Sequence, residues 1–136
     1  MLGINTYILM SNLHYKKIQD IIIGDLIRTI NNSYLKIIYI YSGINRLYNI
    51  ITDKFGTYQV TSDHKLALIN NNQYITKTIN DLKENSNYQG YILSSSQPII
   101  YNFSIELCNI GIYYGFNVNS IDNRIIINNN IITYSK

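Results

Sequence analysis

The chain of 136 residues lacks the cysteines that would cross-link a small fold and the long apolar run that would span a membrane. It contains one cysteine, one proline, no tryptophan and only 14% charged residues. The single cysteine, Cys108, cannot form an internal disulfide, which argues against a disulfide-stapled secreted domain. No apolar run reaches the roughly 20 residues of a membrane span, and the first residues lack the pattern of a signal peptide. We therefore expect an intracellular protein with no membrane partner.

Patterns for ligands and cofactors are also missing. Eleven basic residues against eight acidic ones give a net charge of +3, but the basic residues are scattered. A nucleic-acid-binding face normally gathers them into a patch or stripe, so no nucleic-acid partner is expected. Metal-ligand spacings, a glycine-rich phosphate loop and a Gly-x-Ser-x-Gly elbow are absent from the sequence. We expect no metal and no cofactor.

Isoleucine, tyrosine and asparagine dominate what is present. Isoleucine and tyrosine favour strands, and asparagine favours turns. Turn-forming segments return about every ten residues, which is typical of an all-β sandwich or barrel. The length predicts a single domain over residues 1–136, with at most one short helix, in KTINDLKENS at 77–86. The same bias is what AT-rich codons produce, and it suggests an AT-rich genome such as that of an organelle.

The best candidate for chemistry is His64, in the stretch QVTSDHKLAL. An imidazole titrates near neutral pH and can carry a proton in either direction. Thr61 lies three residues earlier and could hydrogen-bond a backbone group close to the imidazole. Taken alone, the pattern Thr-x-x-His favours a simple turn at the end of a strand. His14 lies in the polar turn SNLH, and Cys108 is expected to be a buried, unreactive side chain.

Several segments, read together, resemble an intein, a protein-splicing member of the Hint family. MLGINTYILM has the shape of the family's first block, with Thr6 before a short apolar strand, and KKIQDIIIGDLI resembles the run that follows. TYQVTSDHKLAL resembles the Thr-x-x-His block, and ITKTINDLKENSNYQGYIL resembles the segment after it. YYGFNVNSIDNRIIINNNIITYS resembles the two C-terminal blocks. The order and spacing of these segments carry the resemblance across the whole chain.

The resemblance implies the Hint horseshoe, an all-β fold with pseudo-two-fold symmetry in which both chain ends meet beside His64. The first residue, Cys or Ser, would attack the preceding carbonyl in an acyl shift, followed by transesterification and cyclisation of a terminal Asn. His64 would protonate the nitrogen of the scissile amide, and Thr61 would hold the geometry. The chain would be a monomeric mini-intein, without a homing endonuclease, acting once on itself. Its partners would be the covalently attached flanking host segments, the exteins.

The chain departs from the family pattern at its catalytic positions. The register puts Met1 at the nucleophile, Tyr134 at the penultimate His and Ser135 at the terminal Asn. Asn123 stands where several relatives have another His, and Gly115 replaces a common Asp. A thioether cannot make the acyl shift, and serine has no carboxamide to cyclise, so the chain as written is expected not to splice. Either native residues have been replaced, which we favour for Met1, or the element is naturally degenerate.

The host and two other functions stay open. AT-rich coding suggests a Clp-type chaperone ATPase encoded in an apicoplast genome as host, which would place the chain in that plastid. A hedgehog-type or bacterial-intein-like autoprocessing domain has no terminal Asn step and so is compatible with Ser135. A non-catalytic β-barrel binding module would also fit the strand pattern, and it would not need the chain ends to lie beside His64.

Overall fold

The computed structural model describes residues 1–82 and 88–136, and within these ranges the chain is built from strands and two three-residue 3-10 helices. The strands are β1 (Leu2–Gly3), β2 (Tyr7–Leu9), β3 (Tyr15–Lys17), β4 (Leu26–Arg28), β5 (Tyr34–Thr52), β6 (Thr57–Thr61), β7 (Lys65–Asn70), β8 (Gln73–Thr78), β9 (Gln89–Ile92), β10 (Ile99–Tyr101), β11 (Phe103–Val118), β12 (Arg124–Ile127) and β13 (Ile131–Tyr134), and the 3-10 helices are η1 (Ile18–Asp20) and η2 (Ile79–Asp81). The expected all-β class is confirmed.

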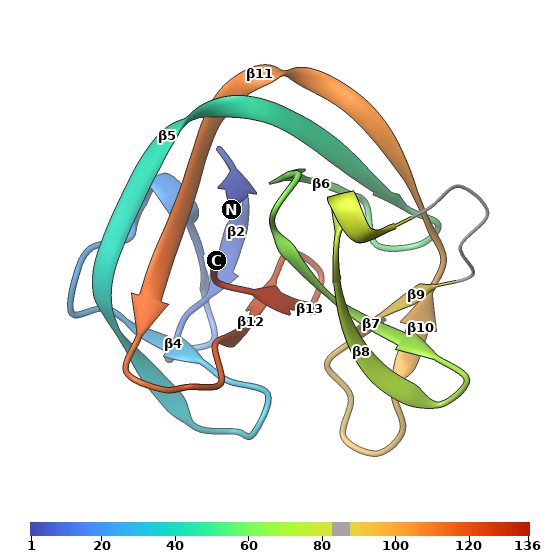
Figure 1. The fold of residues 1–136 in the computed structure, drawn as a ribbon. Coiled ribbons are helices and arrows are strands. Elements are labelled where there is room, and N and C mark those ends of the chain that lie inside the picture. The colour runs from blue at the N-terminus through green and yellow to red at the C-terminus, as the bar shows by residue number, and fades with distance from the viewer. Residues whose placement is uncertain (83–87) are drawn as a thin grey trace.

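Two long strands, β5 and β11, form an antiparallel ribbon that arches over the rest of the molecule (Figure 1). Their lengths of 19 and 16 residues depart from the predicted spacing of about ten residues between turns. Two glycines explain the length of these strands. Glycine often forms turns, but here each one continues its strand. Gly43 pairs with Tyr113 and Gly115 pairs with Tyr41. In each pair the glycine leaves room for the opposite tyrosine ring, so the strand continues.

The strands form two antiparallel sheets, and one of them includes the two strands of the arch. One has the order β11-β1-β6-β5-β4, and because β11 also pairs with β5, four of its strands close on themselves. The other has the order β3-β2-β12-β13-β9-β7-β8, with β10 beside β9. Both chain ends lie under the arch, close to the middle of the molecule (Figure 1). This arrangement is the predicted horseshoe, with β5 and β11 forming its antiparallel arch.

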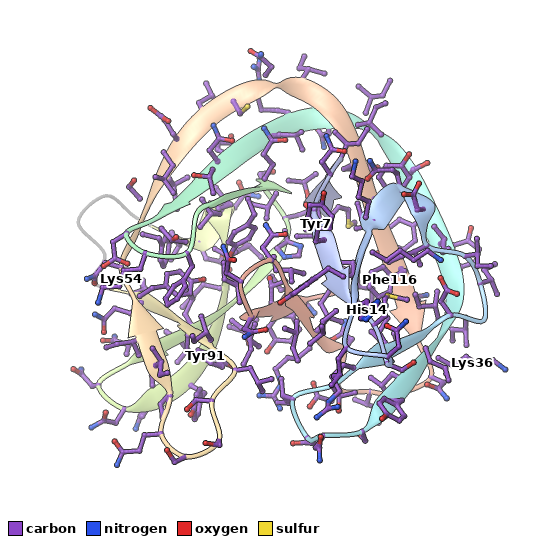
Figure 2. The ribbon with its side chains drawn as sticks, turned by 180° about the vertical axis from the view of Figure 1, so that it is seen from behind. Tyr7, His14, Lys36, Lys54, Tyr91 and Phe116 are labelled. Carbon is purple, nitrogen blue, oxygen red and sulfur yellow. The ribbon has the colours of Figure 1, made fainter. Side chains whose placement is uncertain are left out.

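The core fills the space between the sheets, mainly with isoleucine. Ile8, Ile125 and Ile127 have no exposed surface, and Phe116 of β11 is only 1% exposed. Figure 2 shows Phe116 within the fold, whereas Lys36 and Lys54 project at opposite sides of the molecule. The wide separation of these two lysines agrees with the scattered charge seen in the sequence.

Asparagines make the hairpin turns, as predicted. The β7–β8 hairpin turns through Asn71 and Asn72, which both have positive φ (50° and 63°). Two successive residues of positive φ are typical of the two-residue turns that match the twist of paired strands, and asparagine tolerates that conformation. The turn between β12 and β13 uses Asn128 and Asn130 in the same backbone region.

The helical segments are shorter than expected. The predicted helix at 77–86 is reduced to η2, where the Thr78 hydroxyl accepts a hydrogen bond from the Asp81 N–H and the Asp81 side chain accepts one from Thr78 N–H. Residues 83–86 of the predicted helix lie outside the described residues. A second helical turn, η1, lies at Ile18–Asp20, and it buries the side chain of Ile18.

We expect the isoleucine core to dominate the stability of the fold. Ile127→Ala removes a fully buried side chain and should lower the free energy of unfolding by about 3 kcal/mol, through lost burial and the cavity left behind. Ile44→Ala, in β5, removes a side chain that is 74% exposed and should change it by less than about 0.5 kcal/mol. Urea unfolding of the two variants measures the difference, and equal losses would contradict this assignment of the core.

Candidate functional site

The stretch from Thr61 to His64 is a tight turn between β6 and β7. The N–H of His64 donates to the carbonyl oxygen of Thr61 at 3.1 Å. Thr61 and His64 are buried, at 1% and 0% exposure, whereas Asp63 is exposed. The turn predicted from the sequence therefore points two polar side chains inward. Buried polar groups need partners, and the partners found here come from both ends of the chain.

Residue 1 is held in place by β1, which inserts between β6 and β11. Leu2 pairs with Val60 on one side and with Tyr114 on the other. The carbonyl oxygen of Met1 accepts a hydrogen bond from the N–H of Thr61 at 3.0 Å. Because these contacts are to the main chain and to buried Leu2, the position of residue 1 does not depend on its own side chain.

The nitrogen of residue 1 is the centre of the site. It lies 3.1 Å from Oγ1 of Thr61 and 2.8 Å from Nδ1 of His64. The Thr61 hydroxyl in turn donates to Oδ1 of Asp63 at 2.7 Å. This nitrogen is the atom that a peptide bond to a preceding residue would use, so a junction at residue 1 would fall between a hydroxyl and an imidazole.

The second ring nitrogen of His64 contacts the C-terminal strand. Nε2 lies 2.8 Å from Oγ1 of Thr133 in β13, and both residues are fully buried. The side chains of Tyr58 and Tyr101 are buried in the core near Thr133. Tyr101 pairs with Gly90, and its ring lies over this glycine, where a Cβ would overlap it.

Burial controls the proton affinities of these groups. Loss of hydration, followed by the charge of the nearby amino group, lowers the pKa of His64 well below its usual value of 6.5. Burial also lowers the pKa of the amino group of residue 1 to about 5, against an opposing effect of Asp63. Burial raises the pKa of Tyr58 to about 12. Near pH 7 the imidazole and the amine are therefore neutral, and the tyrosine keeps its proton.

Two main-chain hydrogen bonds hold Ser135 near the C-terminus. The N–H of Ser135 donates to the carbonyl oxygen of Asn123 at 3.0 Å, and the N–H of Phe116 donates to the carbonyl oxygen of Ser135 at 3.2 Å. Ser135 is fully buried. Asn123, predicted as a site residue, thus contributes its main chain to this end. Strand β11 holds both ends, because Tyr114 pairs with Leu2 and Phe116 binds Ser135.

The family resemblance places Tyr134 at the penultimate His position, but its side chain points away from His64. Side chains alternate along a strand, and Tyr134 lies on the opposite face of β13 from Thr133. Its hydroxyl lies 2.8 Å from Oγ1 of Thr76, and its ring packs against a second apolar cluster around Ile69 and Tyr91. The structure therefore brings Met1, Thr61 and His64 together, but gives the Tyr134 side chain other partners.

Gly115 stands where the resemblance implies a common Asp, and the structure gives a reason for its small size. The ring of Tyr41 lies over Gly115, so that a Cβ added there would come within 2.6 Å of the ring carbons and 2.7 Å of the hydroxyl. A side chain at position 115 could be accommodated only if Tyr41 moved. Tyr41 therefore occupies the space that the usual acid would need.

The other two candidates lie apart from this centre. His14 is exposed, as predicted for a turn residue. Cys108 is half-buried rather than fully buried, and its sulfur accepts from the Gln59 amide at 3.3 Å. Within residues 1–82 and 88–136, no three metal-ligating side chains come together. The described part of the chain also contains no helix long and apolar enough to cross a bilayer.

Sequence reasoning missed Thr133. A signal for it existed in IITYS, where Thr133 and Ser135 are polar at alternate positions of an otherwise apolar strand. Alternation places both on one face, and that face is the buried one.

Comparison with solved structures establishes the fold. The MchDnaB-1 intein superimposes with a TM-score of 0.78 at 11% identity, covering 98% of this chain and 99% of that one. The gp41-1 intein gives 0.78 at 18% identity, covering 98% and 96%. A DnaB intein from Synechocystis sp. PCC 6803 gives 0.78 at 16% identity, covering 99% and 97%. No protein-family profile and no curated protein matches the sequence. The chain thus has the Hint fold of inteins, along its whole length.

The lowered proton affinities predict that stability increases with pH. Unfolding restores the amine of residue 1 and His64 to their higher ordinary pKa values, so the unfolded chain binds more protons below pH 8. For a chain that begins at Met1, we expect the free energy of unfolding to fall by about 3 kcal/mol or more between pH 8 and pH 5. Urea unfolding at several pH values measures this fall.

Acetylation of the amine is the control for that measurement. An acetylated nitrogen cannot titrate, so the slope between about pH 6.5 and 8 should disappear while the part due to His64, at lower pH, remains. A slope above pH 6.5 that survives acetylation would show that the amine is not its source.

Proposed function

We propose that the chain is an autoprocessing splicing element, a mini-intein. The observation that carries this proposal is the position of the residue 1 nitrogen, within hydrogen-bond distance of both Thr61 and His64. A second support is that Thr133, near the C-terminal end, contacts the same imidazole. A protein that excises itself needs both of its ends beside one set of catalytic groups, because proximity replaces the binding of a substrate.

The proposed first step breaks the peptide bond before residue 1. The sulfur or oxygen of a nucleophile at that position attacks the carbonyl carbon of the preceding residue, and the bond from that carbon to the residue 1 nitrogen breaks. The nitrogen leaves as an amine, with a proton supplied by Nδ1 of His64, and the proton of the nucleophile passes to the imidazole, so the net change moves one proton from the nucleophile to the nitrogen. The Thr61 hydroxyl accepts the N–H of the scissile amide and keeps the nitrogen facing the imidazole.

In the remaining steps the exteins are joined and the C-terminal bond is cut. Transesterification would move the upstream acyl group from the side chain of residue 1 to a Ser, Thr or Cys side chain at position 136, which is Lys136 in this chain, and the proton of the attacking group would return to residue 1. A terminal Asn at the position of Ser135 would then cyclise, its side-chain nitrogen displacing the amine of residue 136. Main-chain contacts to Asn123 and Phe116 hold that position. Met1 has no ionisable hydrogen on its sulfur and Ser135 has no carboxamide, so we propose that the chain as written is inactive in both bond-breaking steps. A Clp-type ATPase of an apicoplast remains the host suggested by the AT-rich coding.

A restored chain tests the proposal. Met1→Cys together with Ser135→Asn, between short test flanks of which the downstream one begins with Cys in place of Lys136, should yield the ligated flanks and the free 135-residue element, detected by mass spectrometry. Met1→Ala with Ser135→Asn is the matched control and should leave the upstream bond intact. Cleavage without ligation would instead favour a hedgehog-type autoprocessing domain. No cleavage of either bond would favour a non-catalytic binding module. Such a module does not require residue 1 to contact His64, as it does here.

Within the restored chain, His64→Ala should slow cleavage at the upstream bond by about 10²-fold, as expected when a general acid is lost. His14→Ala, at the other histidine, removes an exposed side chain and should leave the rate unchanged. The rates are measured by quantifying precursor and products over time. If the two variants cleave equally fast, His64 is a structural residue of the turn and not the proton donor.

A further inference from the structure

A continuous chain of hydrogen bonds runs through the buried site, and it includes one residue, Thr133, that the proposed splicing reaction does not use. It begins at Oγ1 of Thr133, passes to Nε2 of His64, and continues from Nδ1 to the nitrogen of residue 1. The side chains of Thr133, His64 and Thr61 are at most 1% exposed. From residue 1 the chain continues through Thr61 to Asp63, which is exposed.

The direction of the protons in this chain is set at its Asp63 end. A carboxylate only accepts hydrogen bonds, so the Thr61 hydroxyl at 2.7 Å must donate to it. The Thr61 oxygen then accepts the N–H of residue 1. A peptide nitrogen has only one hydrogen. With that hydrogen given to Thr61, the contact at 2.8 Å to His64 requires the proton to lie on Nδ1.

The neutral imidazole carries one proton, so a proton on Nδ1 makes Nε2 an acceptor. Nε2 therefore needs a donor at 2.8 Å, and the Thr133 hydroxyl is the group that lies there. Every proton in the chain then points from Thr133 towards Asp63, whose carboxylate only accepts.

We propose that Thr133 is a positioning residue that holds His64 in the tautomer with its proton on Nδ1. In that tautomer the proton faces the nitrogen of residue 1, where bond cleavage would require it. The functional consequence rests on the proposed splicing activity, but the tautomer does not require splicing. It can be measured with Met1 in place, in a chain that carries a short upstream flank so that the residue 1 nitrogen is an amide with one hydrogen.

Imidazole ¹⁵N NMR of the labelled chain near pH 7.5 tests the proposal. Its two histidines give separate signals, and the exposed His14 serves as an internal reference. His64 should show a protonated Nδ1 and an unprotonated Nε2. Thr133→Val, which removes the donor to Nε2, should move the tautomer ratio by about tenfold towards a protonated Nε2. Thr133→Ser, which keeps a hydroxyl, should restore the original ratio.

Two further variants make the test decisive. Thr76→Val applies the same substitution to an exposed threonine that contacts Tyr134, and it should leave the His64 signals unchanged. Thr133→Ala removes the same hydroxyl with a smaller side chain, and it should shift the ratio in the same direction, also if Thr133→Val does not fold. A protonated Nε2 in the unchanged chain, or an unchanged ratio in folded Thr133→Val, would overturn the proposal.

The catalytic consequence is measured separately. In the restored chain, Thr133→Val should slow upstream cleavage by about tenfold, and Thr133→Ser should recover most of the rate. If the restored parent chain does not cleave at all, the splicing proposal fails while the NMR result still stands. If it cleaves and Thr133→Val matches it at every pH, Thr133 does not position the proton donor.

Discussion

The structure depends on one buried imidazole that has a partner on each side. His64 contacts the nitrogen of residue 1 through Nδ1 and the hydroxyl of Thr133 through Nε2, each at 2.8 Å. An imidazole inside a protein is costly unless both ring nitrogens are engaged. Here residue 1 provides one of these contacts and strand β13 provides the other. The ends of the chain therefore satisfy the polar group at its centre, and a misplaced end would leave that group without a partner.

The backbone around this imidazole explains how two distant ends can reach it. Strand β1 is only two residues long, yet it is fixed because it pairs with β6 on one side and β11 on the other. At the other end, Ser135 contributes no visible side-chain hydrogen bond among the described residues, but its main chain is held by Asn123 and Phe116. Both ends are thus positioned by main-chain contacts. The side chains at positions 1 and 135 can therefore differ while the geometry around them stays in place.

Local features of the fold could be predicted from the sequence, and features that depend on distant partners could not. The Asn-rich turns follow from the tolerance of asparagine for positive φ. The length of β5 and β11 was not predicted, because Gly43 and Gly115 each lie opposite a tyrosine ring that the sequence alone does not place. Thr61 and His64 stood out by residue type, whereas Thr133 matters only through a contact across 69 residues.

Strand β11 also determines how far apart the two ends of the chain can be. Leu2 pairs with Tyr114, and Ser135 binds Phe116 two residues further along the same strand. Two residues of a strand span about 6.6 Å, a length set by bond geometry. One residue inserted between them would lengthen this spacing by about 3.3 Å and turn one end to the opposite face of the strand. The distance over which the two ends would have to react is therefore encoded in the covalent spacing of a single strand.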